Sequence, residues 1–198
     1  MDIAESADAG RSGRSTPGKV VGAVLAAGAG SRYGMPKILA AQGEWVRASV
    51  SALRAGGCDE VLVAMGAAVV EAPDGATSII VADWESGLSA SVRRVLGEAL
   101  ERDDLAGVVL HVVDMPDVSA AVVRRVLARA ARRRGALVRA TYGGAPRHPV
   151  YLGAEHLRDV MVSLHGDVGA AAYLRAHADI VEMVECGDLA SGLDRDEP

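Results

Sequence analysis

The residues best suited to chemistry lie in one short stretch, Val20–Lys37, which reads VVGAVLAAGAGSRYGMPK. Gly28 and Gly30 follow an apolar run, and two cations, Arg32 and Lys37, come soon after them. Glycines let another group approach the backbone closely, and successive backbone N–H groups in such a turn form a concave anion site. A guanidinium fits two phosphate oxygens, whereas an ammonium is a compact point charge. The stretch therefore predicts a polyphosphate site at the end of a strand.

The ordinary alternative is a glycine-rich turn with no ligand. The chain contains only two lysines, Lys19 and Lys37, and uses arginine for its other strong cations. Lys37 follows Pro36, so a chain that prefers arginine has placed a point charge directly after the turn. This choice favours the phosphate interpretation, which requires a strand before the loop.

A second chemical position is Asp114, which follows the apolar run Gly107–Val113. Ligand sites of open α/β sheets lie at the carboxyl ends of the strands. A carboxylate there is a hard oxygen ligand suited to Mg²⁺. The residues alone leave open whether Asp114 binds a metal or caps the turn before the next helix. His111, inside the same run, is predicted to be a packed core residue.

Several other polar residues have both a structural and a functional interpretation. Gly87 and Ser91 lie near a predicted helix start, where a nucleobase or phosphate can bind, although the residues alone favour an ordinary loop and cap. His148 precedes Pro149, which favours extended backbone at His148, and Asp167 is a candidate helix cap. Two carboxylates, Asp194 and Asp196, lie in an acidic C-terminal stretch.

The order of the predicted elements indicates the fold class. Apolar runs and helical patterns alternate along the chain, which is typical of a three-layer α/β domain with a mostly parallel sheet. Residues 1–18 lack periodicity and are predicted to be a flexible tail, and residues 19–198 form the domain. The predicted strands are Lys19–Leu25, Glu60–Met65, Thr77–Val81, Gly107–Val113, Ala136–Tyr142, Val150–Leu152 and Asp179–Val184. The predicted helices are Trp45–Ala55, one that Ser89 caps and that runs to about Glu101, Ala120–Arg134, Glu155–Val162 and Gly169–Ala176.

Composition narrows the class of protein further. The chain has 198 residues and a formal net charge of −5, and half of its residues are hydrophobic. The acidic balance argues against general nucleic-acid binding, and no apolar run is long enough to span a bilayer. Two distant cysteines, Cys58 and Cys186, indicate neither a disulfide framework nor a zinc site, and a reducing cytoplasm is the expected setting.

The stretch Leu25–Lys37 resembles the signature of the MobA-like nucleotidyltransferases, which attach CMP or GMP to molybdopterin. The cytidylyl branch has the pattern L-A-A-G-x-G-x-R-x-G-x-P-K, and this chain matches it in full. The guanylyl branch has Gly-Gly after Leu-Ala and an aspartate before the lysine, which this chain lacks. The resemblance implies a Rossmann-like nucleotidyltransferase fold and transfer of CMP from CTP to molybdopterin. It also implies Mg²⁺ as cofactor and a molybdenum enzyme or its chaperone as partner.

The resemblance also implies roles for individual residues. Arg32, Lys37 and Asp114 are expected to be catalytic, with Asp194 and Asp196 joining Asp114 as metal ligands. His148 and Asp167 are expected to face the acceptor. The nucleotide is expected to contact Leu25, Ala26, Ala27, Gly28, Gly30, Arg32, Lys37, Gly87 and Ser91. The chain departs from the family pattern at Arg147, where glycine is usual, and at Arg195 and Glu197 near its end.

Two other functions fit parts of the sequence. An NAD(P)H-dependent oxidoreductase is one, because the glycines of the loop echo a dinucleotide turn and some members of this superfamily are described as oxidoreductases. Against it, Pro36 interrupts the helix that a dinucleotide turn requires, and Met65-Gly66 stands where an acid is expected. The other is a non-catalytic nucleotide-binding protein, which only the altered C-terminal stretch supports.

Overall fold

The computed structural model describes residues 17–31 and 33–195. In this part of the chain seven strands form one sheet of order β3-β2-β1-β4-β6-β5-β7. All neighbouring strands are parallel except β6, which runs antiparallel to β4 and β5. The strands are β1 (Lys19–Leu25), β2 (Glu60–Met65), β3 (Thr77–Ile80), β4 (Leu105–Val112), β5 (Leu137–Tyr142), β6 (Ala145–Gly153) and β7 (Val181–Glu185).

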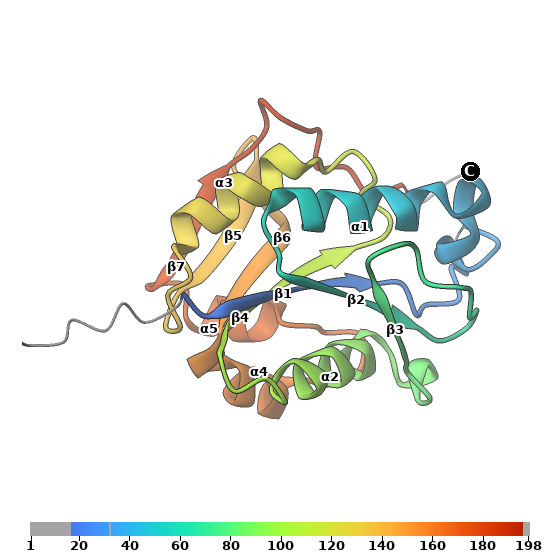
Figure 1. Cartoon of the computed structure of the whole chain (residues 1–198), viewed down its shortest axis with the longest axis horizontal. Coiled ribbons are helices and arrows are strands. Elements are labelled where there is room, and N and C mark those ends of the chain that lie inside the picture. The colour runs from blue at the N-terminus through green and yellow to red at the C-terminus, as the bar shows by residue number, and fades with distance from the viewer. Residues whose placement is uncertain (1–16, 32, 196–198) are drawn as a thin grey trace, which may run out of the picture.

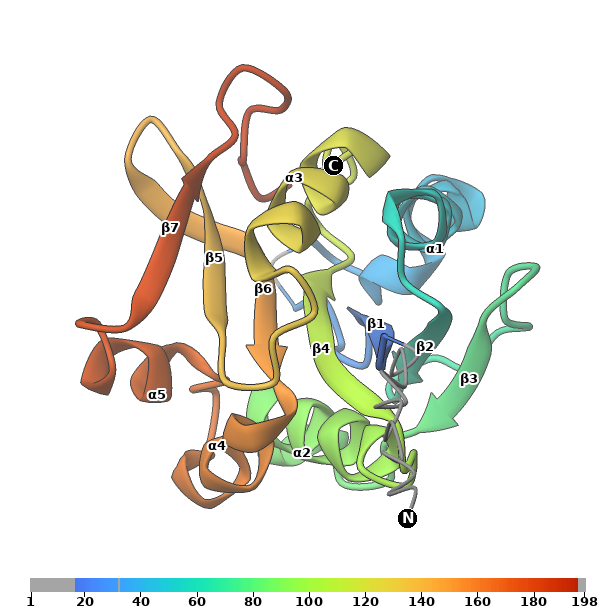
Figure 2. The same ribbon diagram turned by 60° about the vertical axis from the view of Figure 1, so that its left-hand side comes forward.

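Helices cover both faces of this sheet (Figures 1 and 2). Helices α1 and α3 lie on one face, and α2, α4 and α5 lie on the other. The helices are α1 (Glu44–Gly56), α2 (Leu88–Ala99), α3 (Ala120–Ala130), α4 (Leu157–Ser163) and α5 (Ala171–Ala176), with 3₁₀ turns η1 (Lys37–Gly43), η2 (Trp84–Ser86) and η3 (Ala154–His156). The three-layer, mostly parallel α/β prediction is confirmed.

Alternation of side chains along the strands gives the sheet two cores. In β1, Val20 and Val24 pack with α1 and α3, whereas Val21 and Leu25 pack with α2 and the helices that follow β6. Successive strand residues point to opposite faces, so a strand buried on both sides is apolar throughout. This explains why the central strands are continuous Val- and Leu-rich runs.

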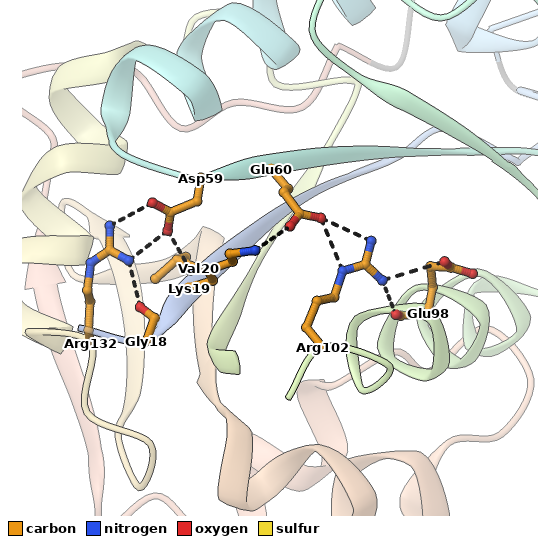
Figure 3. A network of polar contacts seen from close by, with 8 residues as sticks. All are labelled: Gly18, Lys19, Val20, Asp59, Glu60, Glu98, Arg102 and Arg132. Carbon is orange, nitrogen blue, oxygen red and sulfur yellow. Dashed lines mark hydrogen bonds and ion pairs between the residues drawn. The ribbon is translucent and has the colours of Figure 1, made fainter. Parts of the chain in front are cut away.

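The amino ends of the central strands are held by two groups of ion pairs (Figure 3). The Asp59 carboxylate accepts hydrogen bonds from the Val20 amide and the Arg132 guanidinium, which also reaches the carbonyl of Gly18. Burial acts to raise the pKa of Asp59, but these donors outweigh it and lower the pKa. The second group joins Lys19, Glu60, Arg102 and Glu98. The polar edge opposite the predicted site is therefore a structural one.

Two predicted helix boundaries are wrong. Helix α3 ends at Ala130 rather than Arg134, because Ala131 and Arg132 adopt positive φ angles of 49° and 53°. Helix α2 begins at Leu88 with Gly87 at the N-cap, so Ser89 is a helical residue and not the cap. Within the residues that the structure describes, no helix combines the length and apolar character needed to cross a membrane.

Candidate functional site

The predicted site lies where the order of the sheet reverses. The chain passes from β1 to β2 on one side and returns to β4 on the other, and β1 pairs in parallel with both. Leu25 and Val112 are register partners at the carboxyl ends of β1 and β4, and the amide of Val113 donates to the carbonyl of Leu25. Such a reversal is where open α/β sheets hold their ligands. The loop after β1 and Asp114 after β4 therefore lie at the same edge of the sheet.

Gly28 and Gly30, in the loop after β1, differ in the space that a side chain would have at each position. Gly30 has a φ of 63°, and a Cβ there would lie 1.9 Å from the carbonyl oxygen of Met35, so only glycine fits this turn. A Cβ on Gly28 would meet no atom within 4 Å. Gly28 is therefore glycine without a packing requirement, which is the pattern expected where a ligand approaches the backbone. Arg32 lies outside the described residues.

Lys37 and Asp114 join the two loops. The Nζ of Lys37 lies 2.9 Å from Oδ2 of Asp114, and both side chains are largely buried, with 14% and 25% of their surfaces exposed. The other carboxylate oxygen, Oδ1, is buried and accepts no hydrogen bond within the described residues. Buried polar atoms are rarely left unsatisfied, so Oδ1 is an oxygen that a cation or a substrate donor can use.

A cavity of about 540 Å³ opens between these loops and α2. Trp84 and Glu85 line it from η2, and Gly87, Leu88 and Ser91 line it from the start of α2, whose N-terminal end favours negative charge. Its other lining residues are Leu25, Ala26, Ala27, Gly28, Ala29, Gly30, Ser31, Lys37, Val112, Val113, Asp114 and Asp167. The cavity thus gathers all the described residues that sequence reasoning assigned to the nucleotide.

Gly87 packs against Asp167, a residue that lines both this cavity and a second one. Gly87 has a φ of 96°, and a Cβ there would lie 2.5 Å from Oδ1 of Asp167. The amide of Ser89 donates to the carbonyl of Gly166, which fixes the same loop against α2. Two loops that sequence reasoning treated separately, one for the nucleotide and one for the acceptor, are therefore packed together.

The second cavity has a volume of about 300 Å³ and combines apolar walls with arginines. His148 and Asp167, both predicted to face the acceptor, line it together with Arg139 and Arg175. Burial, followed by the nearby charges of Arg147 and Arg175, lowers the pKa of Arg139. Sequence reasoning missed Arg139, although a charged residue in the otherwise buried run Leu137–Tyr142 was a usable signal.

The two histidines of β4 and β6 have different environments. His111 is fully buried, and burial lowers its pKa to about 3, so it is a neutral core residue as predicted. His148 places Nδ1 3.2 Å from the carbonyl oxygen of Leu110, and burial lowers its pKa as well. A neutral imidazole on the cavity wall can donate or accept one hydrogen bond per nitrogen.

The C-terminal stretch returns to the site. The amide of Arg195 donates to the backbone carbonyl of Asp114 over 2.8 Å, which brings this end of the chain to the β4 loop. The carboxylate of Asp194 lies 3.8 Å from the Arg147 guanidinium. The described residues contain no group of three His, Cys, Asp or Glu side chains that is able to hold a metal. Asp196 lies outside the described residues.

The fold and this cavity are those of a nucleotide-binding α/β domain with a glycine loop at the switch point of its sheet. A model of the MobA-like NTP transferase domain matches residues 22–181, and the chain belongs to this family. The match covers every strand except the beginning of β1 and most of β7, and it includes both cavities. The resemblance found in the sequence is thus confirmed.

Three other proteins are similar to this chain over most of its length. It is 32% identical over 192 residues to nicotine blue oxidoreductase of Paenarthrobacter nicotinovorans, covering 89% of this chain and 92% of that protein. The solved Rv0371c homologue from Mycobacterium sp. strain JC1 is 29% identical, with a TM-score of 0.74 and coverage of 90% of each chain. Rv0371c of Mycobacterium tuberculosis H37Rv is 25% identical with a TM-score of 0.70, covering 86% of this chain and 89% of that one. Rv0371c has also been solved in complex with manganese.

Proposed function

We propose that this chain is a metal-dependent nucleotidyltransferase that moves CMP from CTP onto molybdopterin. The observation that carries the proposal is the pairing of Lys37 with Asp114 on the wall of the larger cavity. Nucleotidyl transfer is phosphoryl-type chemistry and needs positioning and charge neutralisation rather than a protein nucleophile. A cation and a carboxylate held together between two loops supply both. The complete Leu25–Lys37 pattern supports CTP over GTP.

In the proposed reaction, an oxygen of the acceptor's terminal phosphate forms a bond to the α-phosphorus of CTP. The bond between that phosphorus and the bridging oxygen of the β-phosphate breaks, and pyrophosphate leaves. The amides of Gly28 and Gly30 would contact the triphosphate, and Arg32 and Lys37 would balance the charge that develops on the leaving group. Gly87 and Ser91, with the apolar residues 25–27, would hold the nucleoside.

A divalent cation fits the donor set at Asp114. This side chain has one buried oxygen with no hydrogen-bond donor in the described chain. Magnesium usually takes one or two protein carboxylates, with substrate phosphates and water completing its shell, so the lack of a three-residue cluster in the described residues fits it. When bound, the cation would neutralise charge on the phosphates. Asp194 and Asp196 are the further proposed ligands, and manganese is the natural alternative to test because Rv0371c has been solved with it.

The acceptor is assigned to the smaller cavity. The two cavities share the lining residues Leu25, Leu88 and Asp167, so two bound substrates would lie side by side. Arg139 and Arg175 supply positive charge for an acceptor phosphate, and His148 and Asp167 supply hydrogen bonds. Both cysteines are free and buried, which fits a reducing cytoplasm. The product would pass there to a molybdenum enzyme or its chaperone.

A ligand screen followed by a transfer assay tests this function. Ligands that bind the native state raise its unfolding temperature, so CTP with Mg²⁺ or Mn²⁺ should stabilise the protein more than GTP or NAD(P)H does. With molybdopterin added, CTP should release pyrophosphate and yield the cytidylylated acceptor. Calorimetry that showed a tenfold preference for GTP, about 1.4 kcal/mol, would contradict the choice of CTP. The absence of pyrophosphate with every NTP would contradict nucleotidyl transfer.

An NAD(P)H-dependent oxidoreductase is the second candidate, because the 32% identical relative is named as an oxidoreductase. The geometry is less suited to it. The loop after β1 leads into the 3₁₀ turn η1 and not into a helix that begins at the glycines. A dinucleotide fold expects an acidic residue at the end of its second strand. Here Gly66 follows β2 and packs against Trp84, and a Cβ at Gly66 would lie 2.5 Å from the Trp84 Cβ, which leaves no room for an acidic side chain. Oxidation of NAD(P)H by a dye substrate, without any NTP, would favour this candidate.

A further inference from the structure

The residues after β7 form a segment that connects the edge of the sheet to its centre. This segment, residues 186–195, is called the C-terminal strap here. It leaves β7 at the edge of the sheet, passes the carboxyl end of β5 and the amino end of the antiparallel strand β6, and reaches Asp114 after β4 (Figure 2). It has no regular helix or strand, so its position depends on the specific contacts described below.

The start of the strap is fixed on the hairpin between β5 and β6. The carboxylate of Glu185 accepts hydrogen bonds from the Thr141 hydroxyl and from the amides of Gly143, Gly144 and Gly187. Asp188 then forms a two-pronged ion pair with Arg125 of α3, at 2.5 and 2.9 Å. These contacts hold the first three residues of the strap, but none of them involves the part of the strap that reaches Asp114.

The turn of the strap at Ser191 is held by the side chain of Asp117. Oδ2 of Asp117 accepts two hydrogen bonds from Ser191, from its amide at 2.8 Å and its hydroxyl at 2.5 Å. The next residue, Gly192, has a φ of 68° and lies so close to the Tyr142 ring that a Cβ would be 2.3 Å from it. The strap therefore turns sharply at Ser191-Gly192 and heads toward the site, where the Arg195 amide meets the Asp114 carbonyl.

We propose that Asp117 is a positioning residue that sets the register of the C-terminal strap against Asp114. Asp114 and Asp117 belong to one short loop, and Met115 between them is fully buried, which anchors the loop in the core. The same loop thus presents one carboxylate to the larger cavity and uses the other to hold the strap. Without the hold on Ser191, Arg195 would lose its fixed place beside Asp114, and Asp194 would lose its place beside Arg147. The effect on catalysis rests on the proposed nucleotidyl transfer, but the effect on structure does not.

The structure provides a spectroscopic reporter of the strap. The guanidinium of Arg195 lies over the Trp45 ring, with its central carbon 5.9 Å from the ring centroid. The centroid of the Tyr33 ring lies 5.3 Å from that of Trp45. The chain has two tryptophans, and the second, Trp84, lines the larger cavity. In a Trp84→Tyr background, the fluorescence of Trp45 would therefore report the environment that Arg195 helps to form.

The test compares Asp117→Ala with Asp188→Ala, which breaks a strap contact on the other side of Ser191. Asp117→Ala should raise amide hydrogen exchange at Ser191 and Arg195 by about tenfold or more and change the Trp45 emission. Asp188→Ala should leave both unchanged. Asp117→Asn keeps an acceptor oxygen and should restore protection. Ser191→Ala is the second variant, for use if Asp117→Ala does not fold. It removes the hydroxyl, which donates to Asp117 and accepts from the Leu193 amide, but it keeps the bond from the Ser191 amide to Asp117, so exchange should be intermediate.

The activity arm asks whether the register matters for transfer. In Asp117→Ala, kcat should fall about tenfold while the KM for CTP stays within about twofold, because the nucleotide loop is untouched. Full protection of the Arg195 amide in a folded Asp117→Ala protein would overturn the proposal, as would an equal loss in Asp188→Ala. An unchanged kcat with an exposed Arg195 amide would overturn the role in transfer. If the wild-type protein transfers no CMP, the proposed function fails, and amide exchange still decides the positioning role.

Discussion

The ammonium group of Lys37 contacts the carboxylate of Asp114 at 2.9 Å, across 77 positions of sequence. The contact joins the loop after β1 to the loop after β4, so each charged group is held in place by the other. In the proposed reaction the two residues have different roles, because Lys37 contacts the phosphates of the nucleotide and Asp114 binds the metal ion. Both groups are already largely desolvated, which strengthens their interaction with a ligand.

Replacing Lys37 by alanine is expected to lower kcat for CMP transfer by about 10²-fold or more, because a cation that faces the leaving group is lost. The free energy of unfolding should fall as well, by about 2–3 kcal/mol, because the largely buried carboxylate of Asp114 loses this partner. Steady-state kinetics and urea unfolding measure the two effects. The matched control is Lys19→Ala, which removes the other lysine and its contact with Glu60 at 3.6 Å. Equal losses of activity in both variants would remove Lys37 from the site.

The variant Asp114→Asn is expected to abolish transfer, because a neutral amide is a poorer ligand than a carboxylate for a hard cation. Calorimetry should show that this variant also binds Mn²⁺ more weakly than the wild type in the presence of CTP. Asp117→Asn is the natural control, since it lies on the same loop and its amide oxygen can still hold Ser191. If Asp114→Asn bound metal and turned over like the wild type, another residue would have to be the ligand.

Two glycine substitutions should separate binding from folding. In Gly28→Ala the new Cβ meets no atom within 4 Å, so stability should change little, while affinity for CTP falls because the methyl group enters the cavity. In Gly87→Ala the residue has a φ of 96°, and the Cβ collides with Asp167 and Gly166, so stability should fall by about 1 kcal/mol or more. Thermal unfolding with and without CTP distinguishes the two. A Gly28→Ala protein with unchanged CTP affinity would argue against nucleotide binding beside that loop.

Acid should release the start of the C-terminal strap. Hydrogen bonds from Thr141 and then from three backbone amides lower the pKa of Glu185 from its ordinary value of 4.5 to about 2. Because the folded-state pKa is depressed, the unfolded chain binds more protons between these values, and stability falls as the pH drops from about 4.5 to 2. The difference in unfolding free energy between wild type and Glu185→Gln should shrink over that window. A difference that stayed constant from pH 7 to pH 2 would contradict this assignment.

The strands of the sheet were largely predictable because they are buried on both faces. The limits of β1 and β2 agree with the predicted runs Lys19–Leu25 and Glu60–Met65, which are continuous and apolar. Strand β6 was not predictable in full, since only Val150–Leu152 has strand character in the sequence. It starts at Ala145 because the Gly143-Gly144 turn pairs it with β5, and this pairing outweighs the prolines within it.

The components of the candidate site were predictable, but their pairing was not. Strand-end rules located Gly28, Lys37 and Asp114, and the cavity contains all three. The Lys37–Asp114 contact and the hold of Asp117 on Ser191 join residues 77 and 74 positions apart, and no local pattern encodes such contacts. Arg139 was missed because its importance depends on β6 and α5, which complete the smaller cavity around it.

The separation of the two cavities has a consequence for how such proteins diversify. The larger cavity is built by the loop after β1 and by α2, whereas β5, β6 and α5 supply much of the smaller one. In the proposed arrangement, in which the smaller cavity binds the acceptor, changes at Arg139, Val150 or Leu174 would alter the choice of acceptor while the glycine loop stays constant. In paralogues of this chain the loop motif would be a poor guide to the metabolite handled, and these three positions would be the informative ones to compare.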